Sequence, residues 1–281
     1  MAHPKLTTHA SGPAVRSLYV EAYGAGKVAL GGATAFIVRS PEFDSETSAW
    51  TDGFALITAR HVVTGKHADT DEPLHKSAAC PERLRVWRPS GSPATLGRDF
   101  GINLLPNGEE AWTEDNPLLG KAADVAVMRL PREVSAWAVR AAYECDYEDS
   151  GLADLTLALG GGLYVVGFPV GIEGDHELPV WTRGSVASEP NTGWRGDRFL
   201  IDSRTRGGQS GSPVIAHVAG GTVRTPDGHF LRTKEQSILV GLYASRINDD
   251  SDIGSVWNVS LIRELLADSL HRDSVPVFQW K

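Results

Sequence analysis

Apolar and polar residues alternate in many short stretches of this chain, and residues typical of turns separate the stretches. Alternation over about four to eight residues is typical of a β-strand with one buried face. In the first half of the chain we expect strands at residues 17–23, 33–39, 55–59, 83–87 and 124–130. A second set is expected at residues 164–167, 180–186, 199–202, 212–217, 237–243 and 254–257. Many short strands punctuated by Gly, Pro, Asn and Asp predict an all-β protein of the sandwich or barrel type.

The segment after the last expected strand has a different periodicity. Leu261, Ile262, Leu265 and Leu266 recur at helical spacing, and Asn258 is suited to cap the first turn. We therefore expect an α-helix at about residues 258–271. Residues 1–15 are expected to form a flexible lead-in, and the long connections at 66–81 and 89–116 are interpreted as insertions.

Composition narrows the class of protein. Apolar residues make up 41% and charged residues 22% of the 281-residue chain, as in ordinary globular proteins. The net charge of −8 argues against nucleic-acid binding, which usually needs a basic face. No apolar run approaches the roughly 18 residues of a membrane span, and the first residues lack the apolar core of a signal peptide. We expect a cytoplasmic protein, in which Cys80 and Cys145 are free thiols rather than a disulfide.

Residues 205–213 read Thr-Arg-Gly-Gly-Gln-Ser-Gly-Ser-Pro and contain the candidate nucleophile, Ser210. Glycines beside a serine permit a sharp turn and the close approach of a substrate. Such a turn can aim the N–H groups of Gly208 and Ser210 at one point, which makes an oxyanion hole. A Gly/Ser/Pro cluster alone is more often an ordinary loop, so further segments have to support this interpretation.

Two earlier segments supply a candidate base and a candidate acid. An apolar run ends in Thr-Ala-Arg-His, so His61 is expected at a strand end, from which its ring can reach a cleft. Asp124 is expected to open the alternating strand at residues 124–130. A serine hydroxyl needs a base beside it, and a buried carboxylate fixes the tautomer of an imidazole base. Together, His61, Asp124 and Ser210 form a candidate catalytic triad.

Other residues compete for two of these roles. His67 and His75 are alternative bases, but both lie in a polar acidic connection rather than at the end of an apolar strand. The alternatives to the acid do not open an alternating apolar strand either, and we expect them to be solvated; they are Asp99, Asp115 and Asp146.

The order of histidine, aspartate and serine along the chain, with these local contexts, resembles that of the chymotrypsin-like serine peptidases. The wording of the motifs is most similar to the bacterial glutamyl endopeptidases and the HtrA-like proteases. The resemblance extends from about Gly31 to about Trp257. It implies a peptidase domain at residues 16–281 made of two six-stranded antiparallel β-barrels, at about 16–135 and 150–257, followed by a helix at about 258–271.

The resemblance also implies a substrate-binding region, and there the chain departs from the family pattern. The implied residues are Arg204, Thr205, Tyr243, Ala244, Ser245 and Arg246. Thr205 matches the threonine of glutamyl endopeptidases, but Tyr243 stands where those enzymes have a histidine. Ala244 lacks the hydroxyl that often supports the triad aspartate. The nearby arginines suggest a preference for acidic substrates, because a guanidinium matches a carboxylate.

A further departure lies beside the nucleophile. Gln209 stands where digestive members of the family carry an aspartate that pairs with a newly cut N-terminus. A neutral amide cannot form that ion pair. We therefore predict that cleavage of an N-terminal segment does not switch this protein on.

We predict a serine endopeptidase that acts on extended polypeptides, needs no cofactor or metal, and is held in check by a regulatory protein partner or by its own selectivity. Two alternatives remain open. One is a catalytically weak or partner-gated binding module with the same fold. The other is an esterase-like hydrolase, although the α/β-hydrolase motif would need a glycine at position 212 and a different order of residues.

Overall fold

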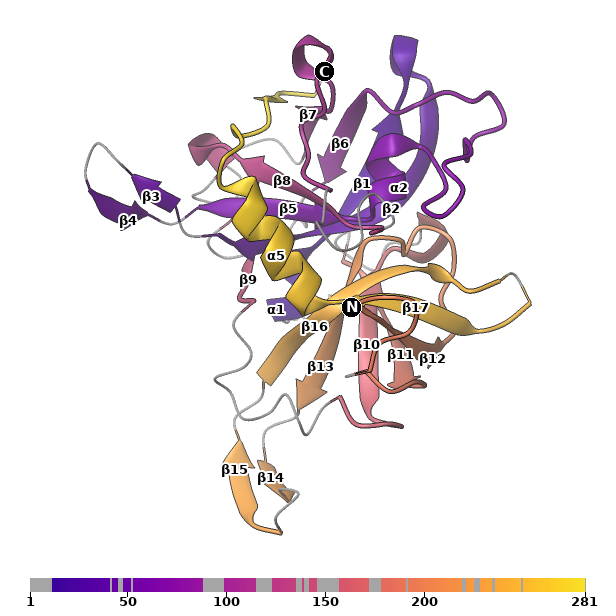
Figure 1. Cartoon of the computed structure of the whole chain (residues 1–281), viewed down its shortest axis with the longest axis vertical. Helices are drawn as coiled ribbons and strands as arrows, with labels where there is room; N and C mark the ends of the chain where they lie inside the picture. Colours follow the sequence, from indigo (N-terminus) through magenta and orange to yellow (C-terminus); the bar gives the residue numbers. More distant parts are fainter. Residues whose placement is uncertain are drawn as a thin grey trace, which may run out of the picture.

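The computed structural model describes most of the chain, and Figure 1 shows its arrangement. The described residues are 12–40, 42–44, 48–51, 53–87, 99–114, 123–134, 138, 142–145, 157–171, 178–190, 192–218, 221–224, 228–233, 236–248 and 250–280. The expected lead-in at residues 1–15 lies mostly outside them, and its described end contains a short helix, α1 (Gly12–Arg16).

The second half of the chain closes into a six-stranded barrel, in which the strands follow the order β10-β11-β12-β17-β16-β13 and every pair is antiparallel. The strands are β10 (Gly162–Gly167), β11 (Val180–Val186), β12 (Arg198–Ser203), β13 (Ser212–Val218), β16 (Gln236–Arg246) and β17 (Ile253–Asn258). All six were predicted from the alternation of apolar residues. Closure pairs each strand on both sides, so the barrel has no exposed edge.

The first half forms a curled sheet above this barrel (Figure 1), with the strand order β18-β7-β6-β1-β2-β5-β8 and β9 paired to β2. The strands are β1 (Ser17–Tyr23), β2 (Ala29–Arg39), β5 (Phe54–Thr58), β6 (Arg83–Trp87), β7 (Asp99–Asn103), β8 (Ala126–Leu130), β9 (Ala142–Tyr143) and β18 (Val277–Phe278). The all-β class is confirmed. The first unit is an open eight-stranded sheet over the described residues, whereas we expected a closed six-stranded barrel.

One helix packs against both units, in addition to the direct contacts of β2 with β13 and of β1 with β10. Helix α5 (Val259–Ser269) begins at Asn258, whose side chain accepts a hydrogen bond from the N–H of Ser260, as predicted. The helix packs against β8 of the sheet and β16 of the barrel. Its apolar face, including Leu261 and Leu265, belongs to one core cluster that contains residues of both units. The helix therefore fixes the sheet and the barrel relative to each other.

The chain beyond the helix returns to the first unit. Val277 and Phe278 pair with β7, and Gly101 leaves room for the ring of Phe278. Trp280 then packs on Tyr23 with ring centroids 4.9 Å apart. Periodicity did not indicate this strand, because two residues are too short a stretch to show alternation.

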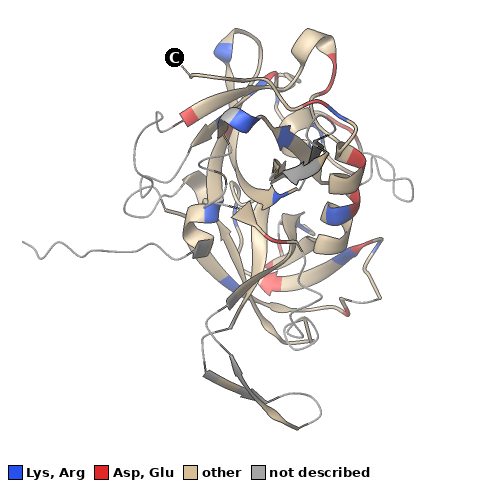
Figure 2. Ribbon diagram, turned by 90° about the vertical axis from the view of Figure 1, so that its left-hand side faces the viewer, with Lys and Arg blue, Asp and Glu red and all other residues tan. Residues whose placement is uncertain are grey.

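Two hairpins extend from the body of the molecule (Figure 1). They consist of β3 (Glu42–Asp44) with β4 (Ala49–Thr51), and of β14 (Gly221–Arg224) with β15 (Phe230–Thr233). Positive and negative residues are interspersed along the ribbon in Figure 2. No helix among the described residues is long and apolar enough to cross a membrane.

Candidate active site

His61 and Asp124 are joined by two hydrogen bonds. Nδ1 of His61 lies 2.7 Å from Oδ2 of Asp124, and the backbone N–H of His61 donates to Oδ1 at 2.9 Å. The two side chains are 17% and 6% exposed, so the pair is largely screened from water. Both carboxylate oxygens thus hold the histidine, one through its ring and one through its main chain. The ring orientation is fixed by this arrangement.

The local structure around these two residues differs slightly from the prediction. His61 lies on a one-turn helix, α2 (Arg60–Thr64), directly after β5, rather than on the strand end itself. Asp124 precedes β8 instead of opening it. Because β5 and β8 are antiparallel neighbours, with Thr58 opposite Ala126, the end of one lies beside the start of the other. This pairing brings the histidine and the aspartate together.

The environment changes the acidity of His61. Burial disfavours the charged imidazolium, but the charge of Asp124 and its hydrogen bond favour it more strongly, so the pKa of His61 is raised above its usual value. The second ring nitrogen has no hydrogen-bond partner among the described residues, and in the absence of substrate such catalytic contacts are often long. The imidazole is therefore oriented by Asp124 with one nitrogen left for another group.

Ser210 lies in a tight loop that is anchored to the first sheet. The carbonyl of Ser210 accepts a hydrogen bond from the N–H of Thr34 on β2, at 2.9 Å. The next residue, Gly211, has a φ of +82°, and a side chain there would collide with the carbonyl of Thr34 and the hydroxyl of Thr58. Ala59 is close as well. The loop thus passes directly beside the residues that lead into His61, and only glycine fits at position 211.

The residues before Ser210 are braced by the loop after β10. Gly208 has a φ of +93°, and a side chain there would meet the carbonyl of Phe168. The N–H of Val170 donates to the carbonyl of Gly207 at 2.5 Å, and Thr34 Oγ1 donates to the carbonyl of Gly208 at 2.8 Å. The carbonyls of Gly207 and Gly208 therefore accept hydrogen bonds from residues outside the loop.

Gln209 closes the same loop from inside. Its side chain is fully buried. The amide oxygen accepts a hydrogen bond from the N–H of Arg206 at 2.8 Å, and the amide nitrogen donates to Thr182 Oγ1 on β11 at 2.9 Å. The sequence showed only that Gln209 is neutral, whereas its partner on another strand depends on the tertiary structure.

Behind His61 a buried charge network supports α2. The Arg60 guanidinium, 4% exposed, lies 3.0 Å from Oε2 of Glu114 and 3.1 Å from Oδ1 of Asp71. Trp112 donates its ring N–H to the same Glu114 oxygen at 2.6 Å. Burial lowers the pKa of Arg60, but its carboxylate partners more than offset this and raise it. No sequence motif marks this network, because its members are widely spaced along the chain.

The expected substrate-binding residues fall into two groups. Thr205 and Tyr243 are buried, and their hydroxyl oxygens lie 2.5 Å apart. Burial raises the pKa of Tyr243 to about 12, so this phenol is neutral at ordinary pH. The two side chains bond to each other and form part of the barrel interior.

The arginines of this region lie nearer to the surface. Asp252 is within reach of both Arg204 and Arg206, with N–O distances of 3.5 and 3.2 Å. Arg204 is 82% exposed, and an exposed ion pair of this kind contributes little energy. Arg246 is half-buried near the end of β16. Two arginines therefore share one carboxylate at this end of the barrel.

Ala244 and Ser245 line a cavity of about 140 Å³ beside His61 and Asp124. Ala244 is buried where a small irregularity interrupts the pairing of β16 with β17, and Ser245 is exposed. Arg198 lines the same cavity and stacks over the ring of Trp257, 4.6 Å from its centroid. No sequence pattern indicated that Arg198 would lie here.

The histidines and aspartates that were alternatives to His61 and Asp124 have other partners where the structure describes them. His67 accepts a hydrogen bond from the N–H of Asp69 and His75 bonds to Ser77, whereas Asp99 pairs with Arg85. Asp115 and Asp146 lie outside the described residues. Cys80 is exposed and Cys145 is buried, and both are free thiols, as expected.

The arrangement is that of a two-unit β protein with a histidine–aspartate pair on one unit and a glycine-flanked serine on the other. The model of the trypsin-like peptidase domain matches residues 33–223, which is more than half of the chain. The protein therefore belongs to the trypsin-like peptidase domain family. Among curated proteins no match was found.

Two solved structures support the fold. The serine endoprotease from Yersinia pestis matches with a TM-score of 0.52 and 12% identity, over 94% of this chain and 68% of that one. The active form of the Rv3671c protease from M. tuberculosis matches with a TM-score of 0.50 and 14% identity, over 93% and 83% of the two chains. At such low identity the likeness shows the fold alone.

The Gln209 contacts generate a testable prediction. Gln209→Ala should lower the free energy of unfolding by about 1–3 kcal/mol, because the partly buried N–H of Arg206 and hydroxyl of Thr182 lose their partner. Urea unfolding of the purified protein would measure the change. Gln279→Ala is the matched control, because Gln279 is exposed and its loss should cost less than about 0.5 kcal/mol. Equal losses in the two variants would contradict the prediction.

Proposed function

We propose that this protein is a serine endopeptidase that uses Ser210 as nucleophile, His61 as general base and Asp124 as the group that orients the base. The observation that carries the proposal is the doubly hydrogen-bonded pair of His61 and Asp124, with the loop of the glycine-flanked Ser210 passing beside the residues that lead into His61. Membership of the trypsin-like peptidase domain family supports a polypeptide as the substrate.

In this mechanism His61 accepts the proton of the Ser210 hydroxyl as the serine oxygen bonds to the carbonyl carbon of the scissile peptide. His61 then donates that proton to the leaving amine, and the acyl group remains on the serine. Water, deprotonated by the same imidazole, releases the acyl group and restores the enzyme. Asp124 stabilises the imidazolium at each stage, which agrees with its effect on the pKa of His61.

The N–H groups of Gly208 and Ser210 would bind the oxyanion that forms on the carbonyl oxygen. Anchoring of the loop carbonyls to Thr34 and Val170 supports this role, because it keeps the loop from turning those carbonyls toward the substrate. The internal contacts of Gln209 support the idea that the loop needs no newly cut N-terminus to order it.

An extended substrate would lie along the end of β16, near Ser245 and Arg246, with main-chain hydrogen bonds as in strand addition. We further propose a preference for acidic residues before the scissile bond. The guanidinium groups of Arg204 and Arg206, which share the single carboxylate of Asp252, support this preference. Thr205 and Tyr243 would contribute shape rather than charge, since they are buried and bonded to each other.

The second candidate function is a binding module with weak or partner-gated catalysis. Ala244 favours it, because this residue lines the cavity beside Asp124 and has no hydroxyl with which to support the aspartate. The two candidates differ in whether Ser210 is activated, which a covalent probe reports directly.

The first test is labelling with a fluorophosphonate. Because a base activates the serine, we expect stoichiometric labelling of the wild type and loss of labelling in Ser210→Ala. Ser212→Ala is the matched control, since Ser212 lies two residues further on and its hydroxyl is buried. A well-folded wild type that resists the probe would favour the gated binding module.

The second test is the pH profile of cleavage. Only the neutral imidazole accepts a proton, so kcat/KM should fall as the pH drops through the raised pKa of His61. Asp124→Asn removes the charge that raises this pKa, so the acid limb should move to lower pH, and kcat should fall by about 10⁴. Asp99→Asn serves as the control and should leave the acid limb and kcat unchanged. An acid limb that stays in place in Asp124→Asn would refute the assigned role.

The third test addresses selectivity. We expect peptides with Glu before the scissile bond to be cleaved faster than those with Lys. Arg246→Glu should lower kcat/KM for the Glu peptides by roughly tenfold or more, in line with a lost charge-assisted hydrogen bond. Lys27→Glu carries the same charge change on the turn between β1 and β2 and should have little effect. Equal cleavage of Glu and Lys peptides by the wild type would remove the acidic preference.

A further inference from the structure

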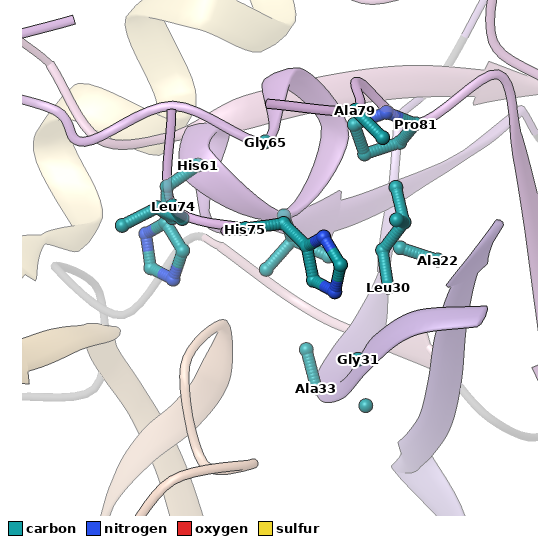
Figure 3. A pocket seen from close by; sticks show the side chains of 12 residues that line it. Ala22, Leu30, Gly31, Ala33, His61, Gly65, Leu74, His75, Ala79 and Pro81 are labelled. Atoms are coloured by element: carbon teal, nitrogen blue, oxygen red, sulfur yellow. The ribbon is translucent and has the colours of Figure 1, made fainter. Parts of the chain in front are cut away.

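A recess of about 190 Å³ lies against His61 and is lined by residues of the first unit (Figure 3). Leu30, near the start of β2, lines one side of it. Leu74 and Ala79, from the long connection at residues 66–81, line the other. Of the side chains that line the recess only two histidines are polar, and none belongs to an Asp, Glu, Lys or Arg. Its chemistry therefore favours an apolar occupant.

The connection that forms the outer wall is held in place by specific contacts. The N–H of Leu74 donates to the carbonyl of Gly65 at 2.8 Å, and Lys66 pairs with Pro73 as an isolated bridge. Asp71 is bound by the buried guanidinium of Arg60 at 3.1 Å. The wall is therefore formed before any ligand binds, which lowers the cost of binding.

The position of the recess indicates which part of a substrate it would contact. The cavity lined by Ala244 and Ser245 lies on the β16 side of His61, where the acyl half of the substrate is proposed to bind. The recess borders β2 instead, and Leu74 contributes to both hollows. Since His61 protonates the leaving amine, the residue that follows the scissile bond must pass on the β2 side of the imidazole.

The size of the recess limits the side chain. A cavity of about 150 Å³ lined by apolar side chains is large enough to hold benzene. The recess can therefore take a leucine or phenylalanine side chain, whereas glycine or alanine would leave most of it empty. Aspartate or lysine would bring a charge out of water into a recess whose only polar side chains are two histidines.

We propose that this recess selects a large apolar residue, leucine or phenylalanine, at the first position after the scissile bond. The connection at residues 66–81 is then a specificity-determining element, and Ala79 sets the depth of the recess. This inference rests on the proposed endopeptidase function and names its substrate class on the leaving-group side.

The test uses a peptide library in which only the residue after the scissile bond varies. We expect the wild type to cleave Leu and Phe peptides with a kcat/KM at least about tenfold above that for Gly or Asp, as differences of a few methylene groups in an apolar pocket allow. Ala79→Leu fills the recess, so the preference for Leu and Phe should fall about tenfold while Gly and Ala peptides change little. Leu30→Ala enlarges the recess and should shift the preference toward the larger Phe.

Lys76→Leu is the matched control, because it adds a leucine to the same connection at an exposed position that does not line the recess. Fluorophosphonate labelling should be equal in all variants, since the probe's leaving group has no side chain to enter the recess. Wild type that labels and cleaves without preference at this position, or equal profiles for Ala79→Leu and Lys76→Leu, would overturn the inference alone. Absence of labelling in the folded wild type would overturn the proposed function together with it.

Discussion

The site depends on the hydrogen bonds by which Thr34 holds the Ser210 loop against the first sheet. Its N–H donates to the carbonyl of Ser210, its hydroxyl donates to the carbonyl of Gly208, and its own carbonyl accepts from Thr58. Thr58 ends the strand that leads to His61. One residue therefore couples the loop of the closed barrel to the strand that positions the base. Each of these bonds has a main-chain carbonyl as its acceptor, so breaking them would leave those carbonyls without these partners.

Two sets of charged groups surround the position of the base: Asp124 pairs with His61, and Glu114 and Asp71 pair with the preceding residue, Arg60. In front, Asp124 raises the pKa of the imidazole through charge and hydrogen bonding, despite the opposing effect of burial. Behind, Arg60 is enclosed by Glu114 and also binds Asp71. Asp124 orients His61, whose imidazole must gain and lose a proton during the reaction. The ion pairs of Arg60 instead anchor α2 and the adjacent connection at residues 66–81. Burying an ion pair is costly unless its hydrogen bonds are satisfied, so the second network serves position more than stability.

Local sequence patterns predicted the strands of the barrel and the C-terminal helix, but they predicted the connections between strands poorly. The barrel strands and the C-terminal helix were predicted because period-2 and period-3.6 patterns report one buried face. His61 was expected on a strand end but lies on the helical turn α2, and Asp124 precedes β8, because chain reversals between strands leave no periodic signal. Strand β7 lies in a stretch that we interpreted as an insertion, and β18 is too short to show a pattern.

The sequence by itself determined the class of fold, the order of the candidate triad and the need for glycine near the serine, because these depend on local residue types and spacing. The tertiary structure decided which side chains meet. The Gln209–Thr182 bond, the Arg60 network and the recess beside His61 each join segments far apart in the chain. The closed barrel brings the first pair together, and the curled sheet of the first unit brings together the segments of the other two. Such contacts depend on how the sheets curl and pack, and no local pattern encodes that.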